Sequence, residues 1–168
     1  MDTAQLRDAY RTLLDAAVTV AESPVPVEPP PGEWDADQIL AHVSLVTATT
    51  LAAVSAITAG ANTTYDNRVA LDTWTIDRVI RLAGGGAGLR ERVHVQADAL
   101  CALAGATLSK TELDTRVPTL LLSHDTALVD QLVPLGDLIS GLAEGELPGH
   151  TRQLLALLPA GTRDETAR

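Results

Sequence analysis

The chain has 168 residues, enough for one domain that buries a core of its own. Its formal net charge is −10, with 22 acidic and 12 basic side chains, which argues against nucleic acids and anionic membrane surfaces as partners. Hydrophobic residues make up 46% of the sequence, but Phe is absent and only two Trp and two Tyr occur, so we expect a core of Leu, Val, Ile and Ala.

The N-terminal part of the chain predicts one helix followed by an extended segment. From Thr3 to Ser23, apolar side chains recur at three- and four-residue spacing and would share one helical face. Between Pro24 and Pro31, five prolines in eight positions remove backbone donors and exclude a helix. We expect this segment to cross the surface in an extended form.

A second helix is predicted to begin after Asp35. This residue can cap backbone N–H groups, and Gln38, three positions later, completes a capping-box pattern. The stretch from Ile39 to Ala61 is almost free of charge and is long enough to span a membrane. However, it is rich in Thr, Ser and Ala and contains His42, so we interpret it as a buried helix and expect no membrane partner.

The middle of the chain predicts a polar loop, a helix and a glycine-rich linker. The polar cluster from Tyr65 to Arg68 would either line a substrate entrance or lie in a solvated loop. Helical spacing resumes from Trp74 to Leu82 and ends at three consecutive glycines, Gly84 to Gly86. The run that continues to Gly88 has neither the preceding strand nor the following Gly-Lys-Ser/Thr of a phosphate-binding loop. We therefore interpret it as a flexible linker.

A helix from about Leu89 to Ala106 and a β-hairpin are predicted next. Cys101 lies in this helix, and a lone cysteine cannot form an internal disulfide. Because no signal-peptide pattern opens the chain either, we expect a reducing cytoplasm. Short, branched, apolar runs from Thr119 to Ser123 and from Ala127 to Val133 predict the two strands of the hairpin.

The C-terminal part predicts a last helix in two pieces. Apolar side chains follow helical spacing from Leu135 to Ala143 and again from Leu154 to Leu158, and the pattern stops at Pro159. We therefore predict a mainly all-α fold, an antiparallel four-helix bundle with one short β-hairpin before the last helix. A single domain would cover residues 1–161, and residues 162–168 would form a disordered tail.

Two charged or titratable side chains fall on apolar helical faces. His42 shares its face with Ile39 and Val46, so its ring should point toward the core, as a metal ligand or as a core histidine bonded to a backbone carbonyl. Glu146 is the next inward position after Leu142 on the last helix, and burying an unpaired carboxylate is costly. Glu146 would therefore either reach water at a frayed helix end or have a buried cationic partner.

His150 follows Glu146 by four residues, so the two side chains can converge one helical turn apart, as ligands in helical metal sites do. Pro148 lies between them and removes one helical hydrogen bond, so the helix must kink or restart there. A restart would displace Glu146 relative to His150. His94 and His124 are interpreted as ordinary polar residues on a mixed face and in the predicted turn.

Two segments resemble the DinB-like superfamily, which includes the mycothiol-dependent maleylpyruvate isomerases. The segment from Trp34 to His42, WDADQILAH, is similar to the start of the second helix in that family. The segment from Glu146 to Leu154, ELPGHTRQL, resembles its late helix, in which two ligands four residues apart precede a Gln-Leu pair. The resemblance implies a DinB-like bundle in which His42, Glu146 and His150 are the metal ligands.

The same resemblance implies a chemistry. Two histidine nitrogens and one carboxylate oxygen form the ligand set of a catalytic zinc site with one open position, and the trio would also suit nickel or iron. In the family, the open position implies a low-molecular-weight thiol such as mycothiol, whose ionisation the metal promotes. We therefore expect a metal-dependent thiol S-transferase or isomerase that acts on a small electrophile.

Two other interpretations agree with the same residues. In one, the chain is a non-catalytic helical bundle that binds a metal or a small apolar ligand and acts through a partner or as a homodimer. In the other, His42 and Glu146 form a buried structural pair with no metal. The sequence specifies neither the substrate nor the metal.

Overall fold

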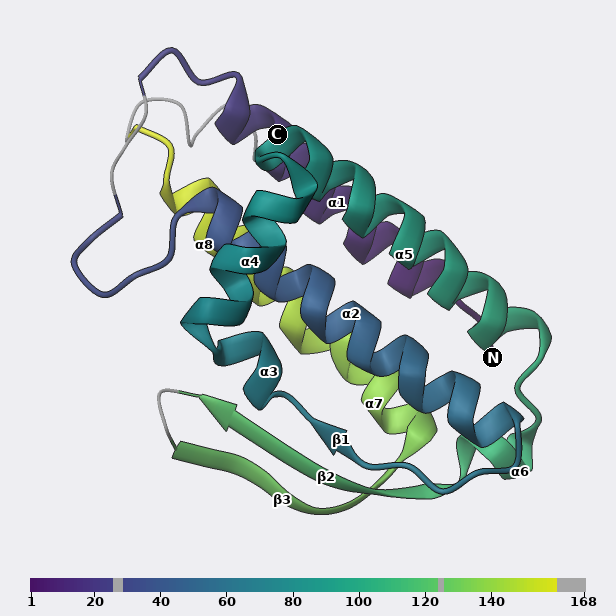
Figure 1. The fold of residues 1–168 in the computed structure, drawn as a ribbon. Coiled ribbons are helices and arrows are strands. Elements are labelled where there is room, and N and C mark those ends of the chain that lie inside the picture. Colours follow the sequence, from purple (N-terminus) through teal and green to yellow (C-terminus); the bar gives the residue numbers. More distant parts are fainter. Residues whose placement is uncertain (26–28, 124–125, 160–168) are drawn as a thin grey trace.

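Helices account for most of the chain in the computed structural model, which describes residues 1–25, 29–123 and 126–159 (Figure 1). The longest are α1 (Ala4–Ala21), α2 (Ala36–Thr58), α4 (Thr73–Ala83) and α5 (Gly86–Ala106). The last helical stretch runs through α7 (Leu135–Gly141), the π-helical turn η1 (Leu142–Glu146) and α8 (Leu147–Ala156). Two single-turn helices, α3 (Arg68–Leu71) and α6 (Lys110–Leu113), lie in connections. The prediction of a mainly helical chain is confirmed.

The long helices pack side by side around one apolar core. Helix α2 contacts α5, α7 and α8, and α1 contacts α5, η1 and α8 (Figure 1). The core is mainly aliphatic, as the composition predicts. Leu, Ile and Val side chains fill the space between closely packed helices at high density. Its largest fully buried side chains are Leu13, Ile39, Leu40, Val43, Ile76, Leu89, Leu100, Leu135, Ile139, Leu147, Leu154 and Leu158.

Helix α2 begins with the predicted capping box. The Asp35 carboxylate accepts a hydrogen bond from the Gln38 backbone N–H at 2.8 Å, and the Gln38 side chain accepts one from the Asp35 N–H at 3.0 Å. By length and composition α2 is able to cross a membrane, but 61% of its most apolar window is buried inside the protein. Burial of this kind is typical of a core helix.

The glycine-rich corner between α4 and α5 differs from the predicted linker. Gly84 ends α4 in the left-handed region, with φ of 77°, but Gly86 to Gly88 already belong to α5. A β-carbon on Gly88 would lie 1.8 Å from the carbonyl oxygen of Ala83. Glycine is therefore required there because the start of α5 touches the backbone at the end of α4, which a linker interpretation does not anticipate.

The predicted hairpin is present and belongs to a three-stranded sheet. Strands β2 (Arg116–Ser123) and β3 (Thr126–Pro134) pair antiparallel, with a register irregularity between Leu121 and Leu122. The short strand β1 (Tyr65–Asp66) adds to β2 in parallel, in the order β1-β2-β3. The sequence predicts a loop at these two residues, since two residues are too short for a strand pattern.

The last helix continues past Pro148 through the π-helical turn. Residues Leu142 to Glu146 adopt the wider π form, and α8 follows directly with Pro148 in its first turn. A proline in the first turn of a helix does not remove a required hydrogen bond, because the N–H groups there have no partner within the helix. The predicted restart is therefore present at Leu147, directly after the π turn.

Three parts of the predictions lie outside the described residues: residues 26–28 of the proline-rich segment, His124 and Asp125 of the hairpin turn, and the tail at 162–168. The described residues of the proline-rich segment form no helix, as predicted.

Candidate metal centre

His42 lies on α2 with its ring directed into the interior. The residue is 3% exposed, and Nδ1 lies 2.8 Å from the carbonyl oxygen of Ala70 in α3. The expectation of a core histidine bonded to a backbone carbonyl is therefore confirmed. It does not exclude the ligand interpretation, since metal-binding histidines usually donate their second ring N–H to such an acceptor.

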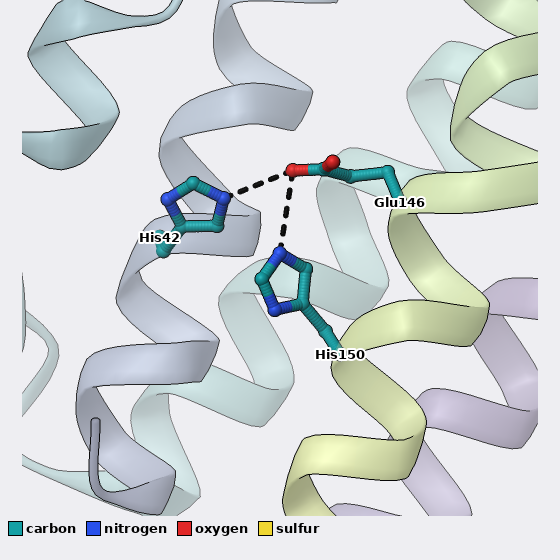
Figure 2. A group of neighbouring side chains, drawn as sticks. All are labelled: His42, Glu146 and His150. Atoms are coloured by element: carbon teal, nitrogen blue, oxygen red, sulfur yellow. Dashed lines mark hydrogen bonds and ion pairs between the residues drawn. The ribbon is translucent and has the colours of Figure 1, made fainter. Parts of the chain in front are cut away.

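Glu146, the last residue of η1, meets both histidines. Its Oε1 lies 2.9 Å from Nε2 of His42 and 3.3 Å from Nε2 of His150 (Figure 2). One ligand atom from each of the three residues lies within 4.8 Å of the others. The predicted convergence is confirmed: of the two alternatives for Glu146, the carboxylate has a buried partner in His42, although its own side chain remains 37% exposed.

His150 keeps the predicted one-turn relation to Glu146 in spite of Pro148. Its side chain is 12% exposed, and its Nδ1 lies 2.7 Å from Oε1 of Gln153, one turn further along α8. In each histidine, Nδ1 therefore contacts another protein oxygen and Nε2 faces Glu146. In Figure 2 both rings approach the same carboxylate oxygen from α2 and α8. The π turn sets Glu146 in this position, and such turns occur often at functional sites.

A neutral His42 ring has too few N–H groups for the two acceptors that it contacts. A neutral imidazole has one N–H and one lone pair, whereas both neighbours, the Ala70 carbonyl and the Glu146 carboxylate, are acceptors. In one of the two contacts, the lone pair of a ring nitrogen would then face the lone pair of an oxygen, which is repulsive. With Glu146 ionised, either the ring carries a second proton or a cation lies between the ring and the carboxylate.

The electrostatics of Glu146 favour its charged form. Partial burial opposes ionisation, but the hydrogen bonds with His150 and His42 outweigh it and hold the pKa of Glu146 well below its ordinary 4.5. Its side chain is 37% exposed, so the carboxylate is reached from the solvent side while both imidazoles are more enclosed. A carboxylate that is ionised at neutral pH beside two imidazole nitrogens is the donor set that borderline divalent cations prefer.

The distances also fit a metal ion. Ligand bonds of about 2 Å place the ligand atoms of a tetrahedral ion about 3.3 Å apart. The two nitrogen-to-oxygen distances, 2.9 and 3.3 Å, are close to this spacing, and all three ligand atoms lie within 4.8 Å of one another. The bonds to Ala70 and Gln153 fix both ring orientations, which is the support that metal-binding histidines need. The three residues could therefore hold a metal ion.

Trp34 covers the two imidazoles from the loop before α2. Its ring centroid lies 4.7 Å from that of His42 and 6.4 Å from that of His150, and it is nearly parallel to His150. Trp34 opens the segment that resembles the second helix of the DinB-like family. Its spacing of eight residues from His42 places both on one side of the helix start, and that spacing is the signal that could have identified the contact.

A cavity of about 560 Å³ opens beside the three residues and extends to strands β2 and β3. Tyr65 and Asn67 line it, so the interpretation of this polar cluster as an entrance is supported for these two residues. Asn67 exchanges two hydrogen bonds with the backbone of Leu122, at 2.8 and 2.9 Å. Asp66 instead pairs with Arg68 at the surface.

The other singled-out side chains lie away from this centre. His94 is exposed and has its ion-pair contact with Asp98, at 3.8 Å. Cys101 is buried and burial raises the pKa of its thiol, consistent with a packed apolar residue. Glu144, two residues before Glu146, is exposed.

Comparison of the chain with protein-family models, curated proteins and solved structures gives no match.

Proposed function

We propose that this protein is a DinB-like four-helix-bundle enzyme that uses a divalent metal, held by His42, Glu146 and His150, for the chemistry of a low-molecular-weight thiol. The observation that carries the proposal is His42 between two acceptors, the Ala70 carbonyl and the Glu146 carboxylate. A cation at Nε2 satisfies both contacts of a neutral ring. The sequence resemblance in the segments 34–42 and 146–154 supports the family assignment.

The protein supplies three ligands, which leaves a coordination position for a fourth group in a zinc-like site. A bound divalent cation would stabilise a thiolate at neutral pH and so provide the nucleophile. Zinc is the first choice for two imidazoles and one carboxylate, and nickel and iron are the alternatives. Mycothiol is the first thiol to test because of the resemblance.

The remaining residues bind and orient. Trp34 restricts the space over both imidazoles, and Asn67 holds the β1 segment against β2 at the cavity wall. Tyr65 is unsuited to acid-base work, because burial raises its pKa to about 12 and its hydroxyl is bonded to Thr50. Addition of a thiol to a small electrophile forms one S–C bond, and the thiol proton is transferred to the product, so no oxidant or reductant is required.

The test compares thiols, mycothiol first, against a panel of small electrophiles with and without added divalent metal. We expect turnover that requires both metal and thiol, and its loss in His42→Ala with the helical circular dichroism spectrum preserved. Equal rates for His42→Ala and the parent protein would contradict the proposal. No metal-dependent turnover would instead favour a non-catalytic protein that binds a metal or a small apolar ligand, alone or as a homodimer.

A further inference from the structure

The cavity beside His42, Glu146 and His150 has an apolar wall on the side of the sheet. On the side of the sheet its wall is formed by Leu121, Val129 and Val133, three aliphatic side chains from β2 and β3. Leu138 and Leu142 extend the same apolar surface on the last helix. A surface of this kind gains free energy by removing an apolar ligand from water and offers such a ligand little directional bonding.

The charges around the cavity point to the same class of ligand. Glu33 and Asp137 line it in addition to Glu146, whereas none of its described lining residues is Lys or Arg. The nearby guanidinium of Arg68 is bound to Asp66 and is not part of the lining. An anionic ligand would therefore meet carboxylates and lose water without gaining a basic partner, apart from whatever the two histidines or a metal provide.

We propose that the cavity selects a neutral, apolar small molecule, whose body lies against the wall made by β2 and β3, and that it rejects dicarboxylates. The reactive end of that molecule would point toward His42, Glu146 and His150, so its role as the electrophile rests on the proposed function. The selection itself follows from the wall and from the charges, and it operates in the metal-free protein.

The experiment uses the full chain after chelator treatment and the neutral dye N-phenyl-1-naphthylamine as the probe. The dye is displaced with 1-octanol, octanoate and octanedioate, three ligands of equal chain length that carry zero, one and two charges. We expect displacement to weaken by about tenfold or more for each added charge, since Glu33, Asp137 and Glu146 line the cavity and none of its described lining residues is Lys or Arg. Failure of the dye to bind, or equal displacement by octanol and octanedioate, would overturn the inference.

Two leucines on the hairpin provide a matched pair of variants. Leu121→Arg places a cation in the wall, and we expect it to weaken dye binding and to let octanedioate compete. Leu132→Arg makes the same change at a residue that is 51% exposed and is not part of the lining, and we expect no effect. Equal effects of both variants would mean that the dye does not bind in the cavity lined by Leu121.

A third variant keeps the test valid if Leu121→Arg does not fold, which circular dichroism would reveal. Asp137→Asn changes an exposed lining residue and removes one charge, so octanoate should displace the dye about threefold more tightly while octanol is unchanged. No change for octanoate would count against the charge argument. Zinc titration of the same samples separates the two proposals. If zinc does not bind but the ranking of the three ligands holds, only the proposed function fails. If zinc binds but the ranking does not hold, only the inference about the cavity fails.

Discussion

Nε2 of His42 lies 2.9 Å from Oε1 of Glu146, although 104 positions separate the two residues in the sequence. The contact joins α2 to the end of η1, and the Ala70 carbonyl on the other side of the ring leaves a neutral His42 without enough protons for both neighbours. The molecule must supply either a second proton or a cation, and these two possibilities have different consequences in solution.

Zinc should bind the parent protein with a stoichiometry of one and should raise its thermal midpoint. A ligand that binds only the folded state stabilises it by about 2.7 kcal/mol at a hundredfold excess over its Kd. His42→Ala should weaken zinc binding by about a hundredfold or more, measured by isothermal titration calorimetry. His94→Ala, which removes an exposed histidine, is the control and should bind like the parent. Unchanged affinity in His42→Ala would favour a structural His42–Glu146 pair without metal.

The metal-free protein should lose stability in acid through Glu146. Because the pKa of Glu146 is held below its ordinary 4.5 by His150 and His42, its contribution is complete above pH 4.5 and is lost as the pH falls below that value. Urea unfolding at about pH 6 and about pH 3 should therefore show a large difference between the parent and Glu146→Gln at the higher pH and a smaller one at the lower. Glu144→Gln, at an exposed neighbour, should follow the parent at both pH values.

The two ligand segments illustrate what the sequence can predict and what it cannot. Apolar spacing and the capping box identified α2 and the inward direction of His42, because both are local properties of a helix. The Ala70 carbonyl and the parallel strand β1 carried no such signal, since their partners come from distant segments. At Pro148, local rules predicted a break, but the π turn before it kept Glu146 and His150 together.

The same contrast explains the glycine-rich corner. Composition alone suggests flexibility at Gly84 to Gly88, whereas the structure uses Gly88 for a close contact between the backbones of α4 and α5. Whether a glycine gives the backbone flexibility or allows a close contact depends on the segment packed against it. The residues next to the glycine in the sequence do not reveal that segment.

Trp34 should report metal binding by its fluorescence. Its ring lies over both imidazoles, so replacing protons or water with a cation changes the charge beside the indole. In Trp74→Phe, which leaves Trp34 as the only tryptophan, zinc should change the emission intensity and saturate at one equivalent. Trp34→Phe leaves Trp74, which is 62% exposed, and should show no response to zinc. A response carried by Trp74 would mean that the ion binds elsewhere.

Alkaline titration should show no free tyrosinate while the protein is folded. The chain has two tyrosines, Tyr10 and Tyr65, and burial raises the pKa of both, that of Tyr65 to about 12. Because these folded-state pKa values exceed the ordinary 10.0, the stability contributed by the protonated phenols is present below pH 10 and is lost as the pH rises above it. Absorbance at tyrosinate wavelengths should therefore rise together with the loss of helical circular dichroism. Tyrosinate formation well before unfolding would contradict the buried environments.

Gly88→Ala should destabilise the fold by about 2 kcal/mol or more, because overpacking against rigid backbone cannot be relieved by a rotamer change. The added Cβ would lie 1.8 Å from the carbonyl oxygen of Ala83, so α4 and α5 must separate at their junction. Gly149→Ala is the matched control, since it lies in α8 with nothing within 4 Å of the added Cβ. Alanine also loses less conformational entropy than glycine on folding, so this variant should gain about 0.5–1 kcal/mol. Urea unfolding of both variants tests the pair, and equal effects would mean that the junction of α4 and α5 is looser than the structure has it.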